Sequence, residues 1–67
     1  MSMKIFVNDE QKQVAAETLS ALLKELDYEG DWLATAVNGE LVSADERDLF
    51  KLNNGDKIEI LSPMQGG

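Results

Sequence analysis

Apolar and polar residues alternate near both ends of the chain, which is the pattern of β-strands that bury one face. Near the start, residues 3–7 (MKIFV) predict a first strand. The turn-rich segment 8–10 and the returning segment 11–15 extend that strand into a hairpin. Near the end, residues 57–61 (KIEIL) alternate in the same way and predict the last strand.

One stretch between these strands has the spacing of a helix instead. Four leucines fall at positions i, i+3, i+4 and i+7, which is one stripe of an amphipathic helix: Leu19, Leu22, Leu23 and Leu26. Thr18 is typical of the residue that caps a helix N-terminus. We expect the helix to end near Asp27, ahead of a polar segment that contains a glycine.

The middle of the chain predicts a second hairpin. Residues 32–37 form an apolar strand, Asn38-Gly39 is a strong tight-turn dipeptide, and residues 40–42 are the returning strand. The polar residues 43–48 predict a loop or a short helical turn.

Three apolar residues after this loop are expected to bring the chain back to the core: Leu49, Phe50 and Leu52. A turn at residues 53–56 then leads to the last strand. The predicted order is β-β-α-β-β-β, an α+β fold with a mixed sheet. One helix covers one face of this sheet and leaves the other face to solvent or to a partner.

The net charge and the apolar content of the chain limit where the protein is located and which kinds of partner it binds. The 67 residues fit one domain, and the net charge of −7 disfavours nucleic acid and anionic membranes as partners. A basic protein surface fits this charge better. No apolar run approaches the length of a membrane span, and there is no cysteine. We therefore expect a soluble, cytoplasmic protein.

Most catalytic chemistry is missing from the sequence. Without histidine or cysteine there is no acid–base imidazole, no thiol nucleophile and no zinc site of the usual ligands. No glycine-rich phosphate-binding loop is present either. We expect a protein that is not an enzyme and that has no cofactor and no metal site.

The unusual feature is the sequence LSPMQGG, which ends on Gly66 and Gly67. A frayed end or an expression scar would explain two terminal glycines without any function. The other interpretation is that the terminal carboxylate is the reactive group. Glycines lack Cβ and can thread into a narrow active site, and Pro63 is typical of a strand end. We expect a β-grasp domain over residues 1–61 and a flexible tail over residues 62–67.

Several segments, in this order, resemble the ThiS family of sulfur carrier proteins within the ubiquitin-like β-grasp superfamily. They are the sequences FVND, QVAA, TL, LLKEL, AVN and NGDKI, followed by the terminal glycines. The resemblance implies that Gly67, with Gly66 as its required neighbour, is adenylated and converted to a thiocarboxylate. It also implies three partners: a ThiF-type adenylating enzyme with ATP, a cysteine desulfurase or other persulfide donor, and a ThiG-type thiazole synthase.

Other functions fit the same sequence. The small subunit of molybdopterin synthase and the carriers that serve cysteine or tRNA thiolation share the fold and the tail. A β-grasp interaction module with incidental glycines is an alternative of another class. Ubiquitin has basic residues before its glycines, whereas Pro63 and Gln65 stand here, which favours sulfur transfer over conjugation to lysines.

The alternation also predicts a docking surface. It places Ile5, Val7, Ile58 and Ile60 under the helix and directs other side chains of the first and last strands to the open face. We expect a partner-binding patch there, close to the tail and bordered by Lys4, Lys57 and Glu59. Its predicted members are Phe6, Leu61, Met64 and Gln65.

Overall fold

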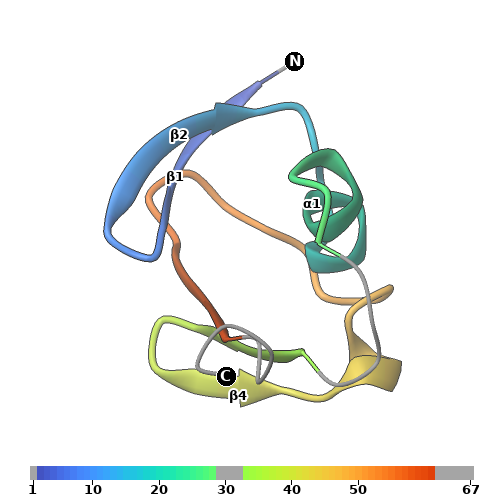
Figure 1. Ribbon diagram of the computed structural model, residues 1–67. Coiled ribbons are helices and arrows are strands. Elements are labelled where there is room, and N and C mark those ends of the chain that lie inside the picture. The colour runs from blue at the N-terminus through green and yellow to red at the C-terminus, as the bar shows by residue number, and fades with distance from the viewer. Residues whose placement is uncertain (1, 29–32, 62–67) are drawn as a thin grey trace.

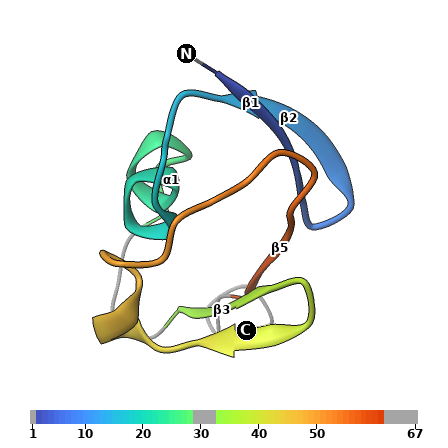
Figure 2. The ribbon, with the colours of Figure 1, turned by 180° about the vertical axis from the view of Figure 1, so that it is seen from behind.

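The structure, a computed structural model, describes residues 2–28 and 33–61 (Figures 1 and 2). The elements follow the predicted order, with a short 3-10 helix added after the fourth strand. They are β1 Met3–Val7, β2 Glu10–Val14, α1 Leu19–Glu25, β3 Ala34–Val37, β4 Glu40–Val42, η1 Ala44–Glu46 and β5 Lys57–Leu61.

The sheet has five strands in the order β2-β1-β5-β3-β4. The last strand in the sequence is therefore the central one, with a hairpin on each side. β5 runs parallel to β1 and antiparallel to β3, and both hairpins are antiparallel. The predicted mixed sheet is confirmed, and Figures 1 and 2 show β5 between the β1–β2 hairpin and the β3–β4 hairpin.

The core lies between α1 and one face of the sheet. Ile5, Val7, Ile58 and Ile60 are all buried, as the alternation predicts. From the helix, Leu19, Leu22 and Leu23 are buried against them, and Leu26 packs at the margin of the core. Within the described part of the chain, the other buried apolar residues are Val14, Ala16, Leu33, Val37, Val42 and Leu52.

Both ends of α1 have clear local causes. The Thr18 hydroxyl accepts a hydrogen bond from the Ala21 N–H at 3.2 Å, which is the predicted N-cap. At the other end Asp27 has a φ of 63°, and the N–H groups of Asp27 and Tyr28 return to carbonyls of the last turn. This left-handed residue terminates the helix, so α1 ends at Glu25, slightly before the expected position.

The prediction that Leu49 packs in the core is wrong. The residue is 84% exposed. Residue Lys51 forms a β-bridge with Thr18, which makes this part of the chain extended. In an extended segment only every second side chain can face inward. Phe50 and Leu52 take those inward positions, whereas Leu49 lies before them in the turn that follows η1, where its N–H bonds the Glu46 carbonyl and its side chain faces solvent.

The polar segment after β4 contains an unexpectedly buried charge. Its short helical turn, η1, is confirmed. Arg47 follows it and is only 7% exposed, although a loop arginine is normally solvated. Its guanidinium donates to the Thr35 hydroxyl at 3.1 Å and to the Leu33 carbonyl, so it ties η1 to the start of β3. The predicted start of that strand at Trp32 lies outside the described residues.

Candidate functional site

The predicted reactive end of the chain follows directly from the central strand. Gly66 and Gly67, together with Met64 and Gln65, lie outside the described residues. The described chain ends at Leu61, the last residue of β5. Because β5 is central in the sheet, the root of the tail is held by the middle of the fold rather than by an edge.

The side chain of Asn8 contacts β5 just before this root. Its Oδ1 accepts a hydrogen bond from the Ile60 N–H at 2.9 Å, and its Nδ2 donates to the Ile60 carbonyl at 3.2 Å. Asn8 lies in the turn between β1 and β2 with a φ of 50°, a left-handed conformation that asparagine tolerates better than most residues. One side chain therefore satisfies both backbone groups of Ile60.

A second asparagine holds the opposite end of β5. The Oδ1 of Asn38 accepts from the Lys57 N–H at 3.0 Å, and its Nδ2 donates to the Asp56 carboxylate at 3.0 Å. Asn38 lies in the β3–β4 turn with a φ of 53°, and Gly39 follows it with a φ of 86°, so the predicted tight turn is confirmed. β5 is thus held by an asparagine from each hairpin.

The two predicted docking residues in the described range share a face but do not touch. Phe6 is half-buried and lies opposite Lys57 at the start of β5, whereas Leu61 is at the other end and 65% exposed. Leu61 lies four positions along the strand from Lys57, which corresponds to about 13 Å. Glu59 lies between them on the same face.

The neighbours of Leu61 are instead small residues of the second hairpin. Leu61 pairs with Ala34, and Ala36 pairs with Leu41 on the edge strand β4. These side chains line a shallow hollow of about 230 Å³ in the open face of the sheet. Leu41 is 83% exposed and was not among the docking residues predicted from the sequence. The alternation of Glu40-Leu41-Val42 about a buried Val42 would have revealed it.

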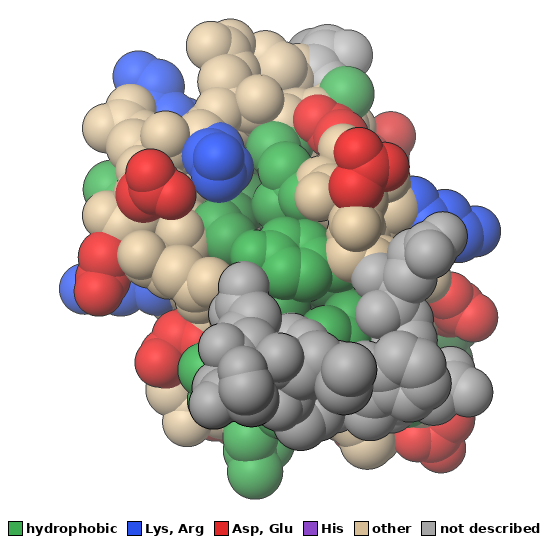
Figure 3. Space-filling view, in the orientation of Figure 1, with side chains coloured by type: hydrophobic (Ala, Val, Ile, Leu, Met, Phe, Trp, Pro, Cys, Tyr) green, Lys and Arg blue, Asp and Glu red, His purple; other side chains and the backbone are tan. Residues whose placement is uncertain are grey.

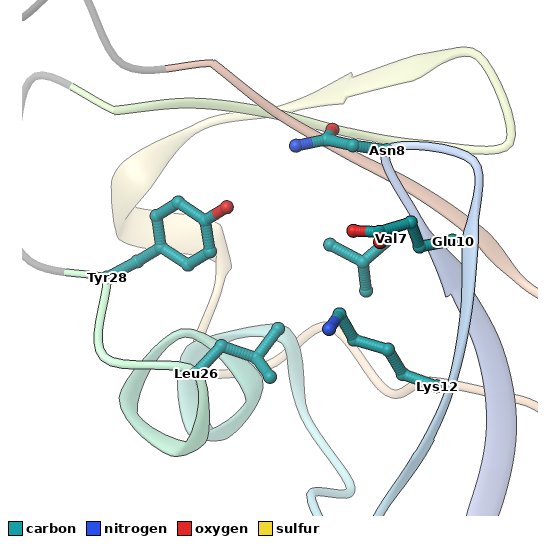
Figure 4. Close-up of a pocket in the computed structure, with 6 residues that line it drawn as sticks. All are labelled: Val7, Asn8, Glu10, Lys12, Leu26 and Tyr28. Atoms are coloured by element: carbon teal, nitrogen blue, oxygen red, sulfur yellow. The ribbon is translucent and has the colours of Figure 1, made fainter. Parts of the chain in front are cut away.

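A cleft of about 190 Å³ lies on the helix side, between the β1–β2 hairpin and the end of α1. Figure 3 shows apolar side chains in this hollow, with charged side chains around it. Figure 4 shows Leu26 and Tyr28 facing Val7 and Lys12 across the cleft. Its other lining residues are Asn8 and Glu10. None of these six is a thiol or an imidazole.

Residues 2–28 and 33–61 hold neither a metal-binding cluster nor a membrane-spanning helix. No group of three or more acidic residues gathers there in a way that could hold a metal ion. No helix of those ranges is long and apolar enough to cross a membrane.

The arrangement of elements defines the class of protein. A hairpin, a helix across one face, a second hairpin and a last strand inserted beside the first are the features of the ubiquitin-like β-grasp fold. With the tail following the central strand, this is the architecture that the sequence predicted.

Comparisons with known proteins identify the family within this class. The family profile described as the ThiS family matches residues 4–67. The crystal structure of the thiamine biosynthesis protein (ThiS) from Geobacter metallireducens is similar with a TM-score of 0.81 at 29% identity, covering 97% of this chain and 100% of that one. A solution structure of a thiamine biosynthesis protein from the same organism gives 0.79 at 26% identity, covering 97% and 88% of the two chains.

A longer relative is also similar to this chain. A protein named thiazole synthase from Paramagnetospirillum magneticum is 35% identical over 66 residues, which are 97% of this chain. The chain spans about a fifth of the length of that relative (20%). The chain belongs to the ThiS family. That family is one of small sulfur carriers, and the two similar structures are those of thiamine biosynthesis proteins.

Proposed function

We propose that this chain carries sulfur as a thiocarboxylate on Gly67 and donates it to the thiazole ring of thiamine. The observation that carries the proposal is the extent of the family match. The match covers residues 4–67 and so includes both Gly66 and Gly67. The central position of β5 supports it further, because the segment that bears these glycines starts from the most constrained strand of the sheet.

The chemistry requires activation because a carboxylate is a poor electrophile. The Gly67 carboxylate attacks the α-phosphorus of ATP on a ThiF-type enzyme, which forms an acyl adenylate and releases pyrophosphate. A persulfide sulfur then adds to the carbonyl, and AMP leaves with the bonding electron pair. A second thiolate attacks the donor's sulfur in the resulting acyl disulfide, forms a new disulfide with it, and expels the thiocarboxylate with the electron pair of the broken S–S bond. The carrier itself needs no cysteine, and it has none.

The proposed acceptor is a ThiG-type thiazole synthase. The protein named thiazole synthase contains a stretch that is 35% identical to nearly the whole of this chain. A carrier sequence within a protein of that name supports thiazole formation over the other thiolation pathways. The persulfide donor is a cysteine desulfurase or an equivalent enzyme, and the proposed location of the whole system is the cytoplasm.

The proposed docking surface for the adenylating enzyme is the open face of the sheet next to the tail. Leu61 and Leu41 are its large apolar side chains, and Ala34 and Ala36 form the floor between them. Phe6, Met64 and Gln65 remain proposed members of the surface. Exposed leucines around a hollow are typical of an interface, and a net charge of −7 favours a basic partner.

Intact-protein mass spectrometry tests the proposal. The chain is incubated with ATP, a ThiF-type enzyme, a cysteine desulfurase and cysteine. We expect a product in which one oxygen of the Gly67 carboxylate is replaced by sulfur, and none when ATP is omitted. A chain with Gly67 replaced by proline is the control and should keep its mass. An unchanged wild-type mass, with a known carrier converted in parallel, would contradict the proposal.

A further inference from the structure

The pairing of β5 is unequal on its two sides. Along β3 the pairing covers Ile58 to Leu61, up to the root of the tail. Along β1 it covers only Phe6 with Lys57 and Val7 with Ile58. The β1 chain then turns away at Asn8 and Asp9, whose φ angles are 50° and 71°. No β1 residue is therefore paired with Ile60.

The Asn8 side chain takes the place of the missing strand. A carboxamide has the same donor and acceptor as a peptide group. The Asn8 backbone N–H bonds the Ile58 carbonyl at 2.9 Å, and its side chain then bonds both the N–H and the carbonyl of Ile60. The hydrogen bonding on the β1 side is thus extended from Ile58 to Ile60. Both backbone groups of Ile60 therefore point to Asn8, whereas Leu61, the next residue, pairs with Ala34 on the β3 side.

We infer that Asn8 is a positioning residue that sets the direction in which the tail leaves the sheet. This inference rests on the proposed function of Gly67. Gly67 lies seven positions after Ile60 in the sequence, and seven extended residues reach at most about 25 Å. A change of direction at Ile60 is therefore amplified at Gly67. Gly67 reaches the active site of an enzyme docked on the sheet only in those molecules whose tail continues from Ile60 in the right direction.

Asn38 provides a matched control within the same chain. It too lies in a hairpin turn, with a φ of 53°, and its side chain makes two hydrogen bonds, to Lys57 and Asp56. Its backbone N–H also bonds a β5 carbonyl, that of Lys57, at 2.7 Å. The two asparagines differ in the part of β5 that they contact. Asn38 holds the start of the strand at Lys57, four positions before Leu61.

The experiment compares Asn8→Gly with Asn38→Gly in the full chain. Glycine accepts a positive φ freely, so each variant keeps its turn and loses only the carboxamide. Pyrophosphate release by a ThiF-type enzyme gives KM and kcat for the carrier. If about a tenth of Asn8→Gly molecules present the tail correctly, KM rises about tenfold with kcat within about twofold. For Asn38→Gly we expect a KM within about twofold of the wild type.

Amide hydrogen exchange supplies a readout that does not depend on the enzyme. The Ile60 N–H is expected to lose protection about tenfold or more in Asn8→Gly and to keep it in Asn38→Gly.

Equal KM values for Asn8→Gly and Asn38→Gly would overturn the inference, whether both rise or neither does. Unchanged protection of Ile60 in Asn8→Gly would overturn it as well. A wild-type chain that no adenylating enzyme activates would instead overturn the proposed function and, with it, this inference. The two failures are therefore distinguishable.

Discussion

Replacing Leu61 by alanine is expected to weaken binding of the adenylating enzyme without unfolding the carrier. Leu61 is 65% exposed, so about two thirds of its side chain is still available for burial by a partner. Complete burial of a leucine stabilises by about 1.5–3 kcal/mol, and two thirds of that is about 1–2 kcal/mol. The dissociation constant should therefore rise roughly 5- to 30-fold.

The same exposure limits the cost to folding. Only about a third of the Leu61 side chain is buried in the free protein, which corresponds to at most about 1 kcal/mol of the free energy of unfolding. A core leucine such as Leu22, which is 0% exposed, should instead cost about 2–5 kcal/mol on truncation to alanine. Thermal melts separate these two cases.

Leu49→Ala is the matched control for the binding measurement. Leu49 is 84% exposed and follows η1, and it lines a neighbouring hollow that shares Leu41 alone with the hollow of Leu61. Calorimetric titration of each variant against a ThiF-type enzyme without ATP should show weaker binding for Leu61→Ala and unchanged binding for Leu49→Ala. Equal dissociation constants for the two variants would refute the assignment of the docking surface to the open face.

Three further predictions concern the tail, the open face and the helix. Deleting Gly67 is expected to abolish formation of the thiocarboxylate, measured by mass spectrometry, and to leave the melting temperature within about 2 °C of the wild type, because the change lies beyond β5. Phe6→Ala should weaken binding of the enzyme by about 1–2 kcal/mol and should destabilise less than Ile5→Ala, which removes a fully buried side chain at about 2–5 kcal/mol. If Phe6→Ala binds the enzyme normally but is destabilised as much as Ile5→Ala, Phe6 belongs to the core and not to the docking surface. Thr18→Ala should cost about 0.5–2 kcal/mol in chemical denaturation because the Ala21 N–H loses its acceptor, and an unchanged midpoint would show that water replaces the cap.

The local patterns in the sequence were sufficient for most of the fold. The alternation of β1 and β5, the leucine stripe of α1 and the Asn38-Gly39 turn each depend on neighbours within a few residues. The pairing of strands depends on residues far apart in the sequence. The separation of Phe6 from Leu61 follows from the register of β1 on β5, which no local pattern contains.

Hydrogen bonds from a side chain to a distant part of the backbone could not be predicted from the sequence either. Asn8 is typical of a turn, and nothing in its neighbours indicates that its carboxamide bonds Ile60, 52 positions later. Arg47 belongs to a polar run that predicts a solvated loop, and its burial depends on acceptors supplied by β3. The roles predicted for Gly66 and Gly67 stay predictions, because these residues lie outside the described ranges.

The central position of β5 has a consequence for how the protein is made. Synthesis proceeds from the N-terminus, so both hairpins and the helix exist before the strand that joins the hairpins into one sheet. A chain interrupted before Lys57 would lack the middle of its sheet and not an edge. It would expose the core faces of both hairpins and would be degraded as an unfolded chain. Because a chain without β5 cannot complete its sheet, the order of strands restricts folding to chains that already contain the strand before the tail.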